Sequence, residues 1–320
     1  MPRSDSLGPI TALLTLNLVV IAALHAITGG RELSDDAPHL IHFARNPWIL
    51  WQGHGAAGLS NTWGGFPPLL PPLFGSAVRP WLAAFPEFVA IRAGVLSWTV
   101  VALLVLHPFA WRVEETTREP LRRALWLYAL TPVVTAAAAV LPQEESYVSL
   151  FAIALCWAAR REKPVLVAGL FGLSAIAAKV FLLFLVVPIA LASARPFRNL
   201  LLFGSAGVGA LVAYLAYHGI RFGELPLLGY RLEPAAGTSV WALLWNLGLE
   251  IPQEVLQPLS LSLTGGLALG CCWLARKRSW SLSRAVAVTL WITTLCVAIA
   301  MPPYLLWNLP FLAILIARME

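Results

Sequence analysis

The sequence predicts an all-α polytopic membrane protein with about ten transmembrane helices. Of its 320 residues, 59% are hydrophobic and 12% are charged, whereas soluble domains carry about 25% charged residues. So few charges cannot cover a soluble globule, which argues against a cytosolic enzyme, a disordered protein or a disulfide-stapled secreted domain. The apolar residues form long runs, such as 133–140 and 165–178, and not the alternating segments of a transmembrane β-barrel.

Ten apolar runs are candidates for spans, although several are shorter than the roughly 20 residues that a membrane helix needs. They cover residues 9–28, 88–110, 124–141, 147–159, 164–178, 180–194, 199–220, 255–275, 284–300 and 304–317. The first is longer than the apolar core of a signal peptide and is interpreted as a retained span. Residues 164–194 are interpreted as a hairpin that turns near Lys179, with one long tilted helix as the alternative. We expect one domain over residues 1–320.

The basic residues lie in short clusters between these runs, which is the pattern of topology signals. With the hairpin, 15 of the 22 Lys and Arg residues fall on one side, which we interpret as the cytoplasm. The outer side then receives a first loop at about 29–86, expected to be structured by its Pro and Trp residues, and another at about 221–254. Because the basic residues serve as topology signals, they explain the net charge of +6, and no nucleic-acid partner is expected.

Asp35 and Asp36 follow the first span by a few residues. If one of them caps a helix, His39 and His42 lie three apart on about one face of it. A carboxylate at a membrane surface can act as a general base toward a hydroxyl. The alternatives are a plain helix cap with solvated histidines, or a divalent metal such as Mg²⁺ or Mn²⁺ held by Asp36 and His39.

Two further polar groups interrupt the apolar pattern. Lys179 would cost roughly 2.5–3.5 kcal/mol in hydrocarbon, so we expect it at a hairpin tip in water or in a polar cavity, where a phosphate is a natural partner. Gln143, Glu144 and Glu145 form a short turn between two runs, either solvated or part of an active-site rim.

Two segments in the C-terminal half contain the remaining candidate functional residues. In the second outer loop, the Arg231 guanidinium matches the geometry of a phosphate, with an ion pair to Glu233 as the alternative. At 302–310, prolines break the last span and leave backbone groups that need partners. Asn308, inside this span, is expected to hydrogen-bond to a neighbouring helix.

The order of these features resembles the C-type (GT-C) membrane glycosyltransferases, in the bacterial branch that uses polyprenyl-phosphate sugars. The similarity runs over nearly the whole chain, with Phe66 in the place of a tyrosine and two glutamates where aspartate is usual. The matching residues are Asp35 and Asp36, Phe66-Pro67-Pro68-Leu69, Gln143-Glu144-Glu145, Ala168-Gly169-Leu170 with Lys179 and Pro188, Tyr230-Arg231 with Ser239 and Trp241, and Pro302 with Tyr304-Leu305-Leu306-Trp307.

The resemblance implies transfer of a sugar, such as mannose, to a lipid or glycan acceptor on the outer face of a bacterial inner membrane, with inversion. It implies Asp36, or else Asp35, as the base. The departing phosphate needs positive charge, for which the candidates are Lys179, Arg231, Arg45 and His42. The candidates for sugar or acceptor binding are Glu144, Glu145, Gln143, Tyr230 and Tyr304.

Two other functions are compatible with the sequence. A lipid or glycolipid transporter or flippase would use the same buried lysine and carboxylates as a substrate or proton path. A non-catalytic partner subunit would keep the GT-C-like fold alone. The long first outer loop and the lack of a visible inverted repeat, the common transporter signature, favour the glycosyltransferase.

Overall fold

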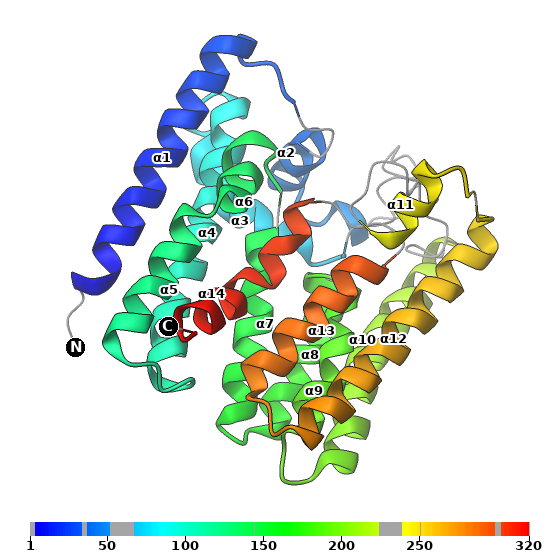
Figure 1. Cartoon of the computed structure of the whole chain (residues 1–320). Helices are drawn as coiled ribbons and strands as arrows, with labels where there is room; N and C mark the ends of the chain where they lie inside the picture. The colour runs from blue at the N-terminus through cyan, green and yellow to red at the C-terminus, as the bar shows by residue number, and fades with distance from the viewer. Residues whose placement is uncertain are drawn as a thin grey trace.

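The computed structural model is a bundle of helices, shown in Figure 1. It describes residues 4–33, 37–51, 67–143, 145–223, 239–249, 251–297 and 302–319. Within these ranges there is no β-strand, as the sequence predicts.

The helices follow the apolar runs closely. Their bounds are α1 (Ser4–Thr28), α2 (Ala37–Arg45), η1 (Ile49–Trp51), α3 (Leu70–Leu82), α4 (Glu87–Arg112), α5 (Arg118–Leu130), α6 (Pro132–Thr135), the π-helical turn η3 (Ala136–Val140), α7 (Glu145–Arg160), α8 (Pro164–Ala177), η4 (Val180–Leu185), α9 (Val186–Leu191), α10 (Pro196–Phe222), α11 (Val240–Asn246), α12 (Gln253–Lys277), α13 (Leu282–Cys296), η6 (Pro302–Trp307) and α14 (Leu309–Ala317).

Four helices in the described ranges are long and apolar enough to cross a membrane: α1, α4, α10 and α12. A fifth span forms if α5 is counted together with the turns that follow it, over Pro132–Val140. The other predicted spans contain shorter helices, so the count of ten stays a prediction.

The predicted span over 124–141 is broken and not straight. Its two parts meet at an angle of 42°. The break falls at Thr131, whose extended backbone (φ −64°, ψ 129°) ends α5. The residue before a proline is disfavoured in the helical conformation, so Pro132 places the bend.

The hairpin over 164–194 is present. Pro164 at the start of α8 and Ile189 near the end of α9 line the same cavity, so the chain between them leaves this cavity and returns to it. A straight helix over 31 residues would separate its ends by about 45 Å. The reversal occurs at residues 178 and 179, where the backbone leaves the helical conformation.

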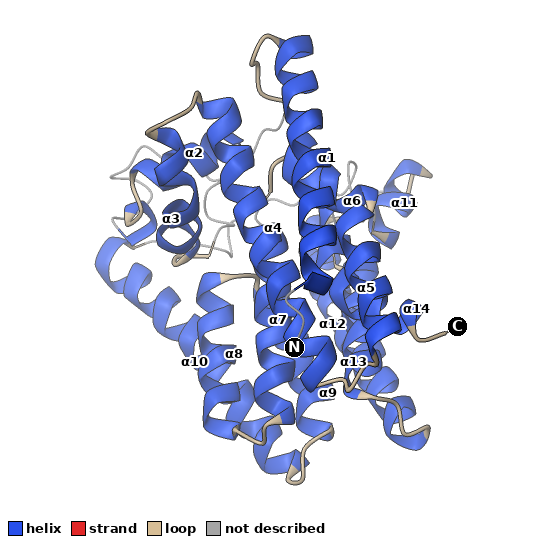
Figure 2. Cartoon of the chain, turned by 90° about the vertical axis from the view of Figure 1, so that its left-hand side faces the viewer, coloured by secondary structure: helices blue, strands red, loops and turns tan. Residues whose placement is uncertain are grey.

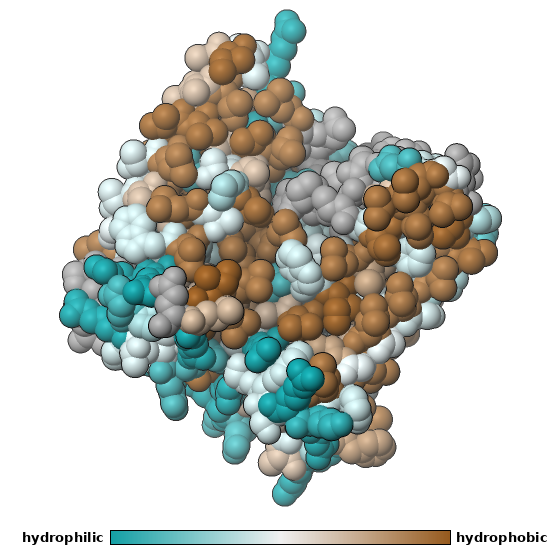
Figure 3. All heavy atoms as spheres, viewed as in Figure 1, coloured by the Kyte–Doolittle hydropathy of each residue, from teal (hydrophilic) through white to brown (hydrophobic). Residues whose placement is uncertain are grey.

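Most basic clusters meet at one end of the bundle, which we call the basic end. There Arg160 and Arg318 both pair with the buried Glu114, and Arg160 lines one cavity with Arg195 and Arg198. Figure 3 shows the same separation, with hydrophilic side chains gathered over the lower half of the view and hydrophobic ones above. This asymmetry is the arrangement that the positive-inside rule produces.

Part of the first predicted outer loop is structured, as expected. Figure 2 shows α2 and α3 together beside the upper part of α4, and both helices pack there. Glycines permit the close approach: a Cβ on Gly75 would lie 2.9 Å from the Phe43 carbonyl oxygen, and one on Gly94 would lie 2.9 Å from Val78 Cα.

A buried arginine joins three segments near the same end as α2. Arg92 of α4 is fully buried and donates to both carboxylate oxygens of Glu32, at 2.6 and 3.2 Å. It also donates to the Ala139 carbonyl at 2.7 Å, and its guanidinium carbon lies 3.6 Å from the Phe88 ring centroid. Through these contacts Arg92 links α4 to the segment after α1 and to the turn η3.

We expect Arg92→Leu to lower the free energy of unfolding by about 3–5 kcal/mol, because it leaves Glu32 and buried carbonyls without their donor. Arg45→Ala is the matched control. It breaks an ion pair with Glu87 whose side chains are 60% and 50% exposed, so we expect a loss of about 0–1 kcal/mol. The measurement is denaturant unfolding of purified protein in detergent, followed by tryptophan fluorescence. Equal losses in the two variants would contradict the role given to Arg92.

Candidate functional site

The candidate site is built on the first turn of α7, at the end of that helix opposite to the basic end. Glu145 is the first residue of α7 and is 1% exposed. The interpretation of this glutamate as part of a solvated turn is therefore wrong. The positive end of a helix dipole favours a carboxylate in a first turn, which offsets part of the cost of its burial.

Lys179 supplies the charge that Glu145 needs. Its ammonium Nζ lies 3.6 Å from Glu145 Oε1, and its side chain is 14% exposed. The lysine stands between α8 and η4 with an extended backbone (φ −129°, ψ 134°). Of the two sequence-based interpretations, the structure supports the one in which this lysine points into a polar interior.

The C-terminal segment closes the other side of Glu145. The indole N–H of Trp307 donates to Glu145 Oε2, and Trp307 is fully buried. Tyr304 stacks on Trp307 with ring centroids 4.6 Å apart and an interplanar angle of 18°. Lys179 Nζ lies 5.4 Å from the Tyr304 ring centroid, within the range of a cation–π interaction. Carboxylate, ammonium and two aromatic rings thus share one location.

Neighbouring hydroxyl groups fix the first turn of α7. Ser149 donates to the Leu306 carbonyl oxygen at 2.7 Å, which ties α7 to η6. The hydroxyls of Ser146 and Thr99 are 2.8 Å apart, which ties α7 to α4. The backbone that carries Glu145 is therefore held from two sides.

The proline element of the first outer loop lies next to the hairpin. The Leu69 N–H donates to the Ile176 carbonyl at 2.8 Å, one turn before Lys179. The Trp51 indole donates to the Pro68 carbonyl at 3.0 Å. Pro67 and Pro68 are buried, so this element covers the end of α8 beside the reversal.

The structure brings together Glu145, Lys179 and Tyr304 from the predicted site residues. Gln143 is buried two residues before Glu145, with its backbone N–H donating to Ala137. Arg45 has a different partner, the exposed Glu87. His39 and His42 lie on α2, which packs on α3 and α4.

Several predicted site residues lie outside the described ranges: Asp35, Asp36, Phe66, Glu144, Tyr230, Arg231 and Glu233. The proposed base and one phosphate ligand are thus predictions from sequence alone. In the part of the chain that the structure describes, no group of three His, Cys, Asp or Glu side chains is placed to hold a metal ion. The suggested pair of Asp36 and His39 includes a residue that is not described.

One expectation for the C-terminal segment is wrong. Asn308 does not lie inside a continuous span, because η6 ends at Trp307 and α14 begins at Leu309. It is fully buried, and neither polar atom of its side chain has a hydrogen-bond partner within the described ranges. Pro310, in the first turn of α14, favours this break between the two short helices.

Sequence reasoning missed Arg92 and the role of Trp307. Arg92 is the only charged residue inside the apolar run 88–110, and an ionisable residue within a span is a functional or structural signal by default. Its partner Glu32 is 60 residues away, a separation over which no local pattern reports pairing.

No protein-family model, curated protein or solved structure matches the chain. An ammonium beside a buried carboxylate can exchange this partner for a phosphate, and a stacked aromatic pair offers an apolar surface for the face of a sugar.

We expect Glu145→Gln and Lys179→Met to be strongly coupled. Each single change leaves a buried charge without its partner, at a cost of about 3–5 kcal/mol in the free energy of unfolding. The double variant removes both charges and should lose less than the sum, with a coupling of about 1–3 kcal/mol. Denaturant unfolding in detergent measures all four proteins. Additive losses would show that the two charges do not interact in the folded protein.

Proposed function

We propose that the protein is a GT-C-type membrane glycosyltransferase that moves a hexose, such as mannose, from a polyprenyl-phosphate donor to a lipid or glycan acceptor. One observation carries the proposal: Glu145, Lys179 and Tyr304, which come from three distant motifs of the predicted set, meet at one location. The proline element at 67–69 lies against the same hairpin.

Each group in this cluster has a chemical use in glycosyl transfer. The Lys179 ammonium can pair with the donor phosphate and stabilise the charge that develops as this phosphate leaves. The Glu145 carboxylate can accept hydrogen bonds from sugar hydroxyls. Tyr304 is half-buried, so its ring can contact a substrate, while the buried Trp307 supports it from behind.

The proposed reaction is a single displacement. The acceptor hydroxyl oxygen forms a bond to the anomeric carbon of the donor sugar, on the face opposite the phosphate. The bond between this carbon and the phosphate oxygen breaks, and polyprenyl phosphate leaves with the bonding electrons. The hydroxyl proton goes to Asp36, or to Asp35 as the second choice. The configuration at the anomeric carbon inverts.

In this proposal Lys179 changes partner during the reaction. At 3.6 Å from Glu145 Oε1 the ammonium is outside normal hydrogen-bond distance, where a short charge-assisted bond would be about 2.7–2.9 Å. The phosphate can therefore compete for it, with one negative charge in the donor diester and a second that develops as polyprenyl phosphate leaves. Glu145 keeps the indole hydrogen bond from Trp307 and turns its other oxygen to the sugar.

The orientation follows from the basic end. The positive-inside rule assigns this end to the cytoplasm, so the cluster around Glu145 faces the extracytoplasmic side. We propose a multi-pass protein of a bacterial inner membrane, in which the shorter helices complete about ten spans. The donor then reaches the site laterally from the bilayer.

A transporter or flippase for lipids or glycolipids is the second candidate function. The observation that favours it is the burial of the Glu145–Lys179 pair, because buried ionisable pairs also mark proton and substrate paths. The two functions differ in whether a covalent bond to the sugar changes.

We expect membranes that contain the protein to transfer label from a polyprenyl-phosphate mannose to a lipid or glycan product. Lys179→Met should lower the rate by about 10²–10³-fold, because the leaving phosphate loses its cation. Asp36→Asn should lower it by about 10²–10⁴-fold through loss of the base. Rates are normalised to folded protein, measured by size-exclusion chromatography.

The matched control is Glu254→Gln, which removes an exposed carboxylate in the first turn of α12 and should leave the rate unchanged. Undiminished transfer by Lys179→Met would contradict its role at the phosphate. If the wild-type protein transfers no sugar from any such donor but moves lipid between leaflets, the transporter is correct.

We expect a cysteine at Glu87 to react with a membrane-impermeant maleimide in intact cells, and a cysteine at Arg122 to react only after lysis. Both native side chains are about half exposed, and the four natural cysteines are all buried, which keeps background labelling low. Labelling at position 122 alone in intact cells would place the basic end outside.

A further inference from the structure

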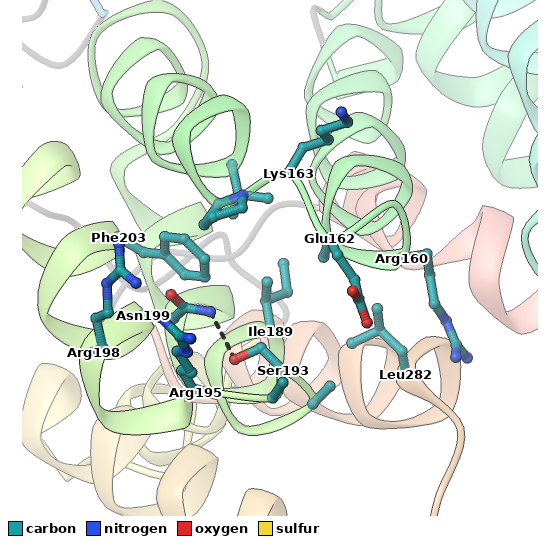
Figure 4. A pocket seen from close by; sticks show the side chains of 15 residues that line it. Arg160, Glu162, Lys163, Ile189, Ser193, Arg195, Arg198, Asn199, Phe203 and Leu282 are labelled. Carbon is teal, nitrogen blue, oxygen red and sulfur yellow. Dashed lines mark hydrogen bonds between the residues drawn. The ribbon is translucent and has the colours of Figure 1, made fainter.

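We propose that the basic end contains a second site, which binds a phosphate group independently of sugar transfer. It is a cavity of about 310 Å³ between the connection from α7 to α8 and the connection from α9 to α10. Figure 4 shows its lining side chains, with Arg195 and Arg198 on one wall and Glu162 and Arg160 on the other. Ligand pockets have volumes of about 300–1,000 Å³, so this space suits a small head group.

The charge of the cavity is strongly positive. Four basic side chains line it, Arg160, Lys163, Arg195 and Arg198, against one acidic side chain, Glu162. Arg160 also forms an ion pair with the buried Glu114, with 3.7 Å between a guanidinium nitrogen and a carboxylate oxygen. The other three basic residues form no ion pair with a carboxylate in the described part of the chain. A ligand with one or two negative charges would balance them.

Two helices begin at the same place. Both α8 and α10 begin at the cavity, with Pro164 and Pro196 as their first residues. The N-cap residues, Lys163 and Arg195, make no side-chain cap hydrogen bond. The ends of the two helix dipoles are positive here. Three cations have more N–H donors than a single carboxylate can accept, which favours the several oxygens of a phosphate, and the two positive helix ends add to the attraction.

Polar side chains also line the floor. Asn199 is 9% exposed, and its amide donates to the Ser193 hydroxyl at 2.8 Å, as the dashed line in Figure 4 shows. Ser193 in turn donates to the Ala190 carbonyl at 2.6 Å. The floor is thus a connected polar network and not a gap between apolar side chains.

The surroundings favour a phosphate carried by a lipid. Val165 and Phe197 directly follow the two prolines and are 80% and 74% exposed. Such apolar side chains beside a basic cavity between membrane helices are suited to acyl chains, while the cations hold the head group. A soluble phosphate compound has the same head-group chemistry but no use for these apolar neighbours.

The experiment uses the full chain in detergent and measures binding of phosphatidylglycerol, phosphatidylcholine and inorganic phosphate by native mass spectrometry and thermal shift. We expect phosphatidylglycerol to bind roughly tenfold more tightly than phosphatidylcholine. In the double variant Arg195→Gln with Arg198→Gln, the affinity for phosphatidylglycerol should fall about tenfold, so that it equals the affinity for phosphatidylcholine. Lys277→Gln with Arg278→Gln, two exposed changes outside this cavity, should leave it intact.

Binding of phosphatidylglycerol alone identifies a lipid as the source of the phosphate, and binding of inorganic phosphate with the same dependence on Arg195 and Arg198 identifies a soluble one. Either result supports the site. If the arginine variant folds poorly, Lys163→Gln provides the same test, with a smaller expected loss of affinity for the phosphate ligand. No binding of either ligand, or equal losses in the Lys277 and Arg278 control, would overturn the proposal.

Discussion

A charge inside an apolar bundle has to be neutralised close by, and the pairing of Glu145 with Lys179 meets this requirement for the centre of the protein. The carboxylate opens α7, so its burial brings that helix start against the reversal between α8 and η4, where the lysine stands. The indole of Trp307 completes the contacts of the carboxylate and brings in the C-terminal segment. Three parts of the chain thus take their positions from one ion pair. The same reversal returns α9 to the start of α8 and so creates the basic cavity.

Charges are managed differently at the two ends of the bundle. Away from the basic end, Arg92 with Glu32 and Lys179 with Glu145 are pairs in which one partner is buried completely. At the basic end the buried Glu114 also pairs with Arg160 and Arg318, but cations outnumber carboxylates there, and Arg195 and Arg198 face a cavity. The charges of a buried pair neutralise each other, whereas cations without a carboxylate partner can bind a ligand or a membrane surface. A phosphate at Lys179 therefore has to displace Glu145, whereas a phosphate in the basic cavity can bind without displacing a carboxylate.

Local patterns in the sequence were sufficient for the helical class and for the turn at Lys179. They also selected Glu145 and Lys179, because ionisable residues in apolar surroundings stand out, whereas Tyr304 was selected through the family resemblance. They failed where the outcome depends on distant partners. Glu145 follows Gln143 and Glu144, a polar run that suggests a solvated turn, whereas its burial depends on Lys179 and Trp307, which are distant in the sequence. Arg92 depends on Glu32 in the same way, and the single run at 124–141 conceals the bend that Pro132 imposes.

The short central helices have a consequence for the surrounding bilayer. In the proposed arrangement of about ten spans, the 14 residues of α8, whose apolar side chains are partly exposed, would cross the bilayer with a rise of about 21 Å, less than the roughly 30 Å of a hydrocarbon core. Hydrophobic mismatch of this kind is relieved when the bilayer becomes locally thinner around the short helix. The protein would therefore carry a local depression in the membrane, in which an amphiphile's polar head travels a shorter way to Glu145 than across an undisturbed leaflet.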